Sequence, residues 1–391
     1  MIRSALDYAR YFAVGSCDPG TRALLHAHRA PIRYPLELDP NAALRDAIGY
    51  LMRAQEVGGT GGLGSYHLIK GWSAPYPETT GYTIPTLIAA SIHLNIAAPL
   101  ECAERAADWL LSIQREDGGW QGGRVGEDRP SIVFNTAQVI RGMLAMHDVG
   151  GNQRYLDAAA RAGDWIMGVQ EPDGAWRTHN FLGVARVYDS YVSAPLLQLF
   201  QRTGRAAFRN AATKNLGWVL SRQLGNGWFQ DADNTIQHNQ RPITHTIAYT
   251  IDGLVECHQR TGDPGLLHAA ELPARALAER FLRNGSLNGR YDADWTGSEA
   301  AITTGCAQLG TVWFRMHAIT NDPLFEQVGQ RMVQWLAEVQ RRSSVGPPAM
   351  HGAVTGSYPL WGRYEKFACP NWAQKYMVDA FLCAEGVLPR Y

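Results

Sequence analysis

The sequence of 391 residues has few charged side chains and no excess of either sign. Charged residues make up only 18% of it, and 36 basic side chains balance 36 acidic ones. This balance excludes the overall basic field that is typical of nucleic-acid-binding proteins, and no long run of like charges suggests a charged tail. We therefore expect no nucleic-acid partner.

Several other signals are missing as well. No stretch approaches the ~18 uninterrupted apolar residues of a membrane span, and the first residues, MIRSALDYARYFAVGS, lack the apolar run of a signal peptide. The six cysteines form no CxxC pair, which favours reduced core thiols. No phosphate-binding or dinucleotide-binding glycine motif occurs. We expect a cytoplasmic protein with no membrane span and no cofactor.

A repeated pattern dominates the sequence. The segment Ala106–Trp120, AADWLLSIQREDGGW, has apolar residues at helical spacing and then a turn at DGG. The same pattern returns at Ala162–Trp176 and at Asn215–Phe229. A unit that recurs at a fixed interval determines the architecture of the whole chain.

Marker glutamines divide the chain into units of about 57 residues. They are Gln55, Gln114, Gln170, Gln223 and Gln340, and FLRNG at 281–285 stands where a further marker is expected. In each of the six units a helix ends at the marker, a Gly-rich loop follows, and a second, more apolar helix begins. The second helices are expected to start near Thr80, Thr136, Ser190, Thr246, Thr304 and Trp372.

Six helical hairpins can form an open superhelix or a closed ring. Open solenoids need polar caps at both ends, but the last helix, Tyr376–Leu388, is apolar and uncapped. We therefore predict an all-α (α/α)6 toroid over residues 41–391. A lead-in over 1–40 is expected to hold one helix around Ser4–Val14 and then an irregular arm. In such a toroid all second-helix N-termini point into one funnel.

Two resemblances support this interpretation. Segments 114–120 and 170–176 match the Q-x3-G-x-W repeat of squalene and terpene cyclases and protein prenyltransferase β-subunits, and 223–228 nearly does. This resemblance implies the toroid over residues 41–388. Blocks 71–87, 244–254 and 356–380 are similar to a family of largely uncharacterised bacterial proteins found with surface-polysaccharide biosynthesis genes. That resemblance implies a setting in carbohydrate assembly.

A column of polar residues precedes the second helices. Its members are Thr79, Asn135, Asp189, His245, Thr303 and Asn371. Ser, Thr, Asn and Asp are good helix N-caps, so capping alone would explain most of the column. His245 is a poorer cap, which makes it the best functional candidate.

The residues near this column suit proton transfer. Tyr249 lies four residues after His245 and so on the same helical face. Glu78 and the pair Tyr188–Asp189 stand at matching helix entrances. A histidine and a tyrosine on one wall suit removal of the proton α to a uronate carboxylate and its return. We predict a lyase or C5-epimerase of an acidic saccharide, with these five residues as the catalytic group.

Other functions remain open at this level. Glu78 and Asp189 across the funnel would instead suit glycoside hydrolysis. The segment 231–235, DADNT, resembles the D-x-D-D-T acid motif of terpene cyclases but has Asn234 at the fourth position. A zinc site at Cys257, His258 and Cys306 is disfavoured because the spacing does not match. A noncatalytic glycan-binding protein is a further alternative.

The loops and inner helices supply candidates for substrate binding. Tryptophans of the loops can stack on sugars, although Trp120 and Trp176 are better explained as wedges between units. Basic side chains near the loops would favour an anionic substrate: Lys70, Arg124, Arg129, Arg177, Arg186, Arg241, Arg363 and Lys366. The predicted substrate-binding residues are Trp72, Tyr82, Asn135, Gln138, His179, Arg186, Asp231, Trp295, Trp361, Arg363, Glu365, Asn371 and Trp372.

Overall fold

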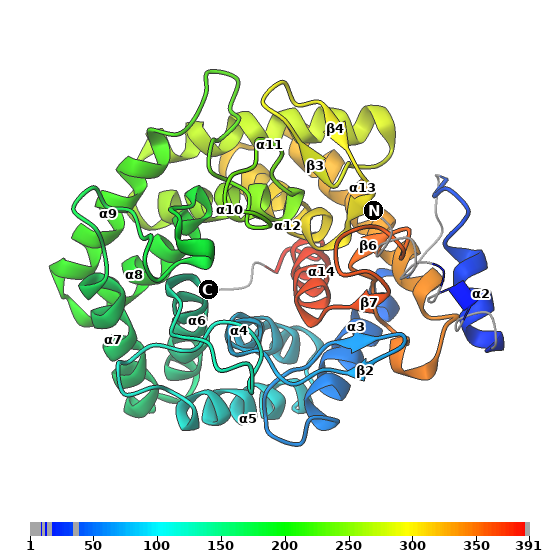
Figure 1. The fold of residues 1–391 in the computed structure, drawn as a ribbon, viewed down its shortest axis with the longest axis horizontal. Helices are drawn as coiled ribbons and strands as arrows, with labels where there is room; N and C mark the ends of the chain where they lie inside the picture. Colours follow the sequence, from blue (N-terminus) through cyan, green and yellow to red (C-terminus); the bar gives the residue numbers. More distant parts are fainter. Residues whose placement is uncertain (1–8, 10–11, 14–17, 34–38, 388–391) are drawn as a thin grey trace.

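The computed structural model describes residues 9, 12–13, 18–33 and 39–387. Its main helices form two concentric rings (Figure 1). The inner ring consists of α4 (Pro77–Leu94), α6 (Val133–Gly150), α8 (Ser190–Thr203), α10 (Thr244–Thr261), α12 (Thr303–Thr320) and α14 (Asn371–Ala384). The outer ring consists of α3 (Pro40–Glu56), α5 (Ala98–Ser112), α7 (Gln153–Gly168), α9 (Ala206–Leu220), α11 (Pro264–Asn284) and α13 (Pro323–Ser343).

The rings are closed. The last inner helix, α14, packs against the first, α4, and the last outer helix, α13, packs against α3. Each outer helix packs mainly against the inner helix that precedes it in the chain, and α3 packs in the same way against α14, so the outer ring surrounds the inner one (Figure 1). The predicted (α/α)6 toroid is therefore confirmed.

The marker glutamines join neighbouring units. The Gln114 side-chain amide donates to Gly118 O at 2.9 Å in its own loop and to Ala158 O at 2.9 Å in the next outer helix. Gln55, Gln170 and Gln223 make the same pair of bonds in their units. Gln340 donates to Gly352 O and, across the ring closure, to Ala43 O at 2.8 Å.

Local contacts also explain why glycine and tryptophan occupy their positions in the repeat. Gly174 has φ +92°, and a Cβ there would lie 2.5 Å from Lys214 O of the next outer helix, so a side chain would strain the turn. Trp176 is fully buried and its indole donates to Ile166 O at 2.9 Å. Trp120 repeats this with Leu110 O. These two tryptophans are wedges, as the sequence favours, and do not face the funnel.

The fifth unit lacks a glutamine, and an arginine takes over part of its task. Helix α11 ends with Gly285 in a left-handed cap at φ 71°. Arg331 on the next outer helix donates to Leu282 O at 3.3 Å. The contact between units five and six is thus made from the opposite side of the interface.

The lead-in differs from the prediction. Most of the expected helix at Ser4–Val14 lies outside the described residues. The arm behind it is not irregular throughout, because it contains α2 (Pro19–Ala27). Asp18 caps this helix by accepting from Thr21 N at 2.7 Å, and Leu24 is buried against the toroid. The D-P sequence at 18–19 is a helix start that the sequence interpretation overlooked.

Short strands and turns lie in the loops at the end of the toroid where the inner helices begin. They form β1 (Tyr66–His67), β2 (Gly71–Trp72), β3 (Arg290–Tyr291), β4 (Gly297–Ser298), β5 (Ala301–Ile302), β6 (Ser357–Tyr358) and β7 (Ala368–Cys369), paired as β2-β1-β7, β3-β4 and β5-β6. The β1–β7 and β5–β6 pairs tie loops of different units together, whereas β3–β4 lies within one loop.

No helix among the described residues is long and apolar enough to cross a membrane. The described cysteines, namely Cys102, Cys257, Cys306, Cys369 and Cys383, are buried free thiols.

The ring closure gives a first prediction. Gln340→Ala removes two hydrogen bonds and strips two backbone carbonyls of a partner, so we expect the free energy of unfolding to fall by about 1–3 kcal/mol in urea. The exposed Gln327 on the same helix is the matched control, and Gln327→Ala should change stability by less than about 0.5 kcal/mol. Equal losses in the two variants would contradict the role assigned to the marker.

Candidate active site

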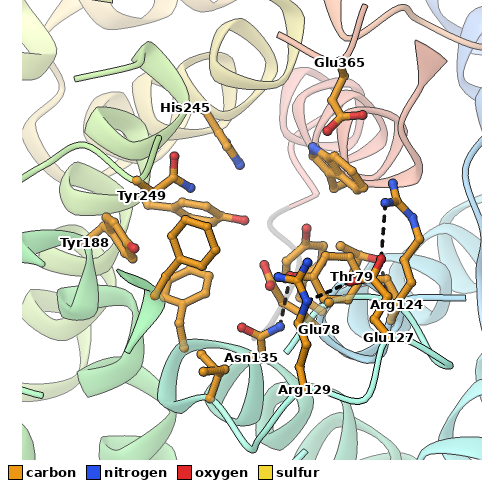
Figure 2. Close-up of a pocket in the computed structure, with 18 of the residues that line it drawn as sticks. Glu78, Thr79, Arg124, Glu127, Arg129, Asn135, Tyr188, His245, Tyr249 and Glu365 are labelled. Carbon is orange, nitrogen blue, oxygen red and sulfur yellow. Dashed lines mark hydrogen bonds and ion pairs between the residues drawn. The ribbon is translucent and has the colours of Figure 1, made fainter. Parts of the chain in front are cut away.

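A cavity of about 270 Å³ lies where the inner helices begin. Figure 2 shows His245 and Tyr249 on one side of it and Glu78, Asn135 and Arg129 on the other. Its lining is Tyr76, Glu78, Thr79, Tyr82, Gly123, Arg124, Glu127, Arg129, Ile132, Phe134, Asn135, Phe181, Tyr188, Asn234, His245, Tyr249, Tyr364, Glu365 and Trp372. The lining mixes aromatic rings with a few convergent polar groups, as ligand sites commonly do.

His245 is held in one orientation by the neighbouring helix. Gly305 on α12 allows close packing, since a Cβ there would lie 2.7 Å from His245 N. One turn further along α12, Gln308 Oε1 accepts from His245 Nδ1 at 2.6 Å. Nε2 is therefore the unprotonated nitrogen of the neutral ring, and the ring reaches into the cavity (Figure 2). Burial lowers the pKa of His245 to about 4, so the imidazole is a free base at neutral pH.

Tyr249 lies one helical turn below His245, as the spacing predicts. The two ring centroids are 4.5 Å apart. The Tyr249 hydroxyl is buried without a hydrogen-bond partner among the described residues, and burial raises its pKa well above 10. Tyr249 is thus a neutral hydroxyl, able to donate a proton.

Glu78 faces these two residues from the second position of α4. Burial raises the pKa of its carboxyl to about 7, and a hydrogen bond from Tyr76 opposes this shift. Asn135 Nδ2 in turn donates to the Tyr76 hydroxyl at 3.0 Å. Between pH about 4 and about 7 the cavity therefore contains a protonated carboxyl opposite a neutral imidazole.

A second carboxyl and two arginines lie at the mouth. Glu365 lines the cavity, and burial raises its pKa while the charges of Arg124 and Lys70 lower it. Arg129 Nε lies 2.9 Å from Glu127 of the same loop (Figure 2). Arg124 and Arg129 are about one-third and one-half exposed, so both can meet an incoming anion.

Buried ion pairs close the funnel beneath the tyrosines. Asp252 and Glu256 continue the face of α10 that carries His245 and Tyr249. Arg315 donates to Asp252 at 2.8 Å, and Arg141 donates to Glu256 at 2.5 Å. Lys375 and Asp379 make a third pair, 2.7 Å apart. The first two pairs join α10 to α12 and to α6, and Asp379 of the third accepts from Thr86 of α4 at 2.7 Å. Together they form the floor of the site.

The structure brings together much of the predicted site. The predicted residues that line the cavity are Glu78, Tyr82, Asn135, Tyr188, His245, Tyr249, Glu365 and Trp372. Trp361 and Arg363 lie outside it and line an adjoining groove.

Asp189 is not placed in the cavity. Its carboxyl is fully buried and accepts from Asn180 Nδ2 at 2.7 Å. Burial raises its pKa well above the usual range, so it is a neutral, structural acid. The predicted pair of carboxyls Glu78 and Asp189 is therefore wrong as a pair across the funnel, and Glu365 takes the second place.

The remaining predicted binding residues have structural partners elsewhere. Trp72 packs on Tyr50 at 5.4 Å, and His179 contacts Trp165 edge-on at 5.5 Å. Gln138 accepts from Arg141 Nε at 2.9 Å inside the inner ring.

Four further candidates are anchored in loops. Arg186 is buried and donates to Ile236 O at 3.0 Å. Asp231 faces Arg222 at 4.0 Å. The buried Trp295 donates to Asn226 O at 3.1 Å. Asn371 donates to Leu63 O at 2.9 Å and to Gly64 O. None of the four lines the cavity.

The polar column does not cap the inner helices. The N-cap positions of these six helices are Tyr76, Ile132, Asp189, Ile243, Ile302 and Pro370, and none makes a side-chain cap bond in the described chain. The column members lie within the first turn or at its edge instead. The capping explanation is therefore wrong, and the uncapped N-termini give this end of the ring a positive potential.

Sequence reasoning missed several lining residues. Tyr76 directly precedes α4, and Tyr364 accepts from Trp372 Nε1 at 2.9 Å. Phe134 contacts Tyr249 edge-on, with ring centroids 4.9 Å apart. Each lies within two residues of a predicted site residue. Which of such neighbours faces the cavity depends on the local direction of the backbone, which the sequence does not show.

Comparisons with known proteins support the fold. The chain is similar to the unsaturated glucuronyl hydrolase from Bacillus sp. GL1, with a TM-score of 0.68 and 15% identity over 90% of this chain and 100% of that one. A sugar epimerase from a ruminal bacterium gives a TM-score of 0.71 and 12% identity over 89% and 98%. A polysaccharide lyase gives 0.64 and 11% over 89% and 97%. No family model matches the chain.

These neighbours are glycoside hydrolases, sugar epimerases and a polysaccharide lyase built on six-hairpin toroids. At such low identity the likeness shows a common fold.

The raised pKa of Glu78 predicts a pH-dependent stability. The folded state binds this proton more tightly than the unfolded chain, so its contribution is fully present below pH 4.5 and is lost as pH rises through about 7. Glu78→Gln should therefore unfold at the same urea concentration as the native protein at pH 4.5. It should be more stable by up to ~3 kcal/mol above pH 7. A difference that does not change with pH would contradict the assigned pKa.

Proposed function

We propose that this protein is an enzyme that removes the proton α to the carboxylate of a uronate residue in an acidic saccharide, as lyases and C5-epimerases do. The observation that carries the proposal is the unprotonated Nε2 of His245 facing the cavity, with Nδ1 held by Gln308. A base must be unprotonated and aimed at the proton that it takes.

The opposite wall supplies what this reaction needs. The C5 proton becomes acidic only when the charge of the adjacent carboxylate is neutralised in the transition state. The protonated Glu78 can donate a hydrogen bond to that carboxylate, with the Asn135 amide beside it. The arginines at the mouth and the uncapped helix N-termini favour entry of an anion.

The proton balance follows from these positions. His245 Nε2 takes the C5 proton, and the electron pair of the C–H bond moves into the uronate carboxyl group. In a lyase this pair then forms the C4–C5 double bond as the C4–O bond breaks, and the Tyr249 hydroxyl gives the leaving oxygen a proton. In an epimerase a proton returns to C5 from the other face, and Glu78, which lies on the opposite side of the cavity from His245, donates it.

Glycoside hydrolysis is the second candidate, and one observation favours it. Glu78 and Glu365 both line the cavity, and burial raises the pKa of both. A hydrolase needs one carboxyl as acid and the other as nucleophile or base. The roles of Glu78 in the two reactions differ, so its amide variant separates them.

A terpene-cyclase-like activity has less support. The cavity lining is rich in polar groups, and Asp233 of the DADNT segment is paired with Arg290 at 3.0 Å. Hydrogen bonds from Thr235 and the charge of Arg290 lower the Asp233 pKa against the effect of burial. An ionised, paired carboxylate is a poor proton donor to a hydrocarbon.

The cytoplasmic location and the setting in surface-polysaccharide assembly stay predictions of the sequence.

Proton abstraction predicts a loss of the C5 hydrogen. In deuterated buffer, NMR should show the H5 signal of a uronate oligosaccharide decreasing, either by exchange for deuterium or with the appearance of an alkene H4. His245→Gln should slow this by about 10²–10⁴-fold. Water-dependent cleavage that retains H5 would refute proton abstraction and favour hydrolysis.

The two buried groups also predict a bell-shaped pH profile. kcat/KM should fall below pH about 4, as His245 becomes protonated, and above pH about 7, as Glu78 ionises. For a lyase, Glu78→Gln keeps a neutral hydrogen-bond donor, so it should retain activity within roughly tenfold and lose the alkaline limb. Glu365→Gln is the matched control and should keep that limb. Complete inactivation by Glu78→Gln in a folded protein would contradict the lyase; it would support the epimerase if the native protein exchanges H5 and the hydrolase if it retains H5.

A further inference from the structure

A second hollow leads away from the cavity at the mouth. A groove of about 690 Å³ is lined by residues that directly follow or precede cavity residues in the chain: Thr235 follows Asn234, and Arg363 precedes Tyr364. A further hollow of about 750 Å³ shares Glu299 and Ala300 with this groove. We call the two together the arginine groove. It extends from the funnel past the β3–β4 and β5–β6 pairs towards α11 and α13, which appear side by side in Figure 1.

The groove is strongly basic. Its arginines are Arg33, Arg241, Arg283, Arg290, Arg331 and Arg363. Among the described residues, Glu299 is the only acidic side chain that lines it. In a chain of zero net charge, this concentration of guanidinium groups on one track selects an anion.

The first part of the groove is held in place before any ligand binds. Glu299 has a left-handed backbone with φ 67°, a conformation that is strained for glutamate. Its carboxylate pairs with Arg290 at 3.3 Å and with Arg363 at 2.9 Å. The buried Asp233 holds Arg290 from behind at 3.0 Å. These contacts fix two guanidinium groups next to each other at the exit from the cavity.

The other lining groups fit a sugar chain. Trp361, whose ring also contacts Phe12 with centroids 5.9 Å apart, contributes an aromatic side chain to the lining, and Thr235, Asn239 and Ser298 contribute hydroxyl and amide groups. Arg241 is paired with Asp292 at 3.1 Å and Arg363 with Glu299, but their side chains are 52% and 75% exposed, so an incoming anion can reach both. The cavity itself is at the small end for a ligand pocket, which leaves the rest of a long substrate to lie outside it.

We propose that the arginine groove binds the continuing chain of an acidic polysaccharide whose terminal or reacting unit lies in the cavity. This proposal rests on the proposed function for the identity of that unit, and it adds that the substrate is a polymer of several charged sugars. Carboxylates or sulfates along the chain would pair with the arginines, and a sugar ring would stack on Trp361.

Binding and turnover test it separately. Binding is measured by calorimetry on the His245→Gln protein, with size-defined di-, tetra- and hexasaccharides from alginate, hyaluronan and heparin. We expect affinity for at least one series to rise with length. The double variant Arg241→Ala, Arg363→Ala should bind the hexasaccharide of that series about tenfold or more weakly, while the exposed Arg154→Ala, on α7, should not differ from the parent. Maltohexaose, which is uncharged, should gain nothing from the groove.

The outcomes separate the groove from the chemistry. The groove proposal would be overturned by any of three results: an affinity that does not depend on chain length, an affinity that the double variant does not change, or no binding of any of the three series. Tighter binding of a single-stranded DNA 10-mer than of every acidic sugar would also overturn it. If long chains bind in a way that depends on the arginines but H5 is never lost, the groove proposal is supported and the proposed reaction is refuted. If H5 is lost at a rate that depends neither on chain length nor on the arginines, the proposed reaction is supported and the groove proposal is refuted.

Discussion

The marker glutamine is the interaction on which the toroid depends. Its side-chain amide donates one hydrogen bond to the loop that follows its own helix and one to the next outer helix. Five of the six units make these bonds, Arg331 makes the contact in place of the missing glutamine of the fifth unit, and Gln340 completes the ring at Ala43. These contacts fix the turn and the spacing between units, so the first turns of all six inner helices meet at one end. The cavity exists only because of that convergence.

The fold could be predicted from the sequence because its determinants are local. A glutamine, a glycine that must adopt a left-handed conformation and a buried tryptophan recur within seven residues, and each contacts its own unit or the next one. The site could be predicted only in part. His245 and Tyr249 followed from helical spacing. Asp189 failed because α8 begins one residue after it, whereas α4 begins two residues before Thr79. Residues at the same position of the repeat therefore point in different directions. The pattern of residue types does not reveal that the two helices start at different positions of the repeat.

The chemical character of the site comes from burial. Burial lowers the pKa of the His245 imidazole to about 4 and raises that of the Glu78 carboxyl to about 7, so both groups are uncharged between these two pH values. Desolvation thus creates a base and a hydrogen-bond donor that coexist over about three pH units. The ion pairs beneath them compensate one another and keep the inner helices in register, so the floor can be charged while the cavity above it is neutral. The sequence shows which groups can ionise, but not how far each is buried, and burial is what shifts these pKa values.

The position of a bound uronate tests the central claim most directly. A crystal structure of the His245→Gln protein with an acidic oligosaccharide should place the uronate carboxylate against Glu78 and Asn135. The C5 hydrogen should point at residue 245, with the C4 oxygen near Tyr249. A glycosidic oxygen placed between Glu78 and Glu365, with C5 turned away from residue 245, would contradict the account.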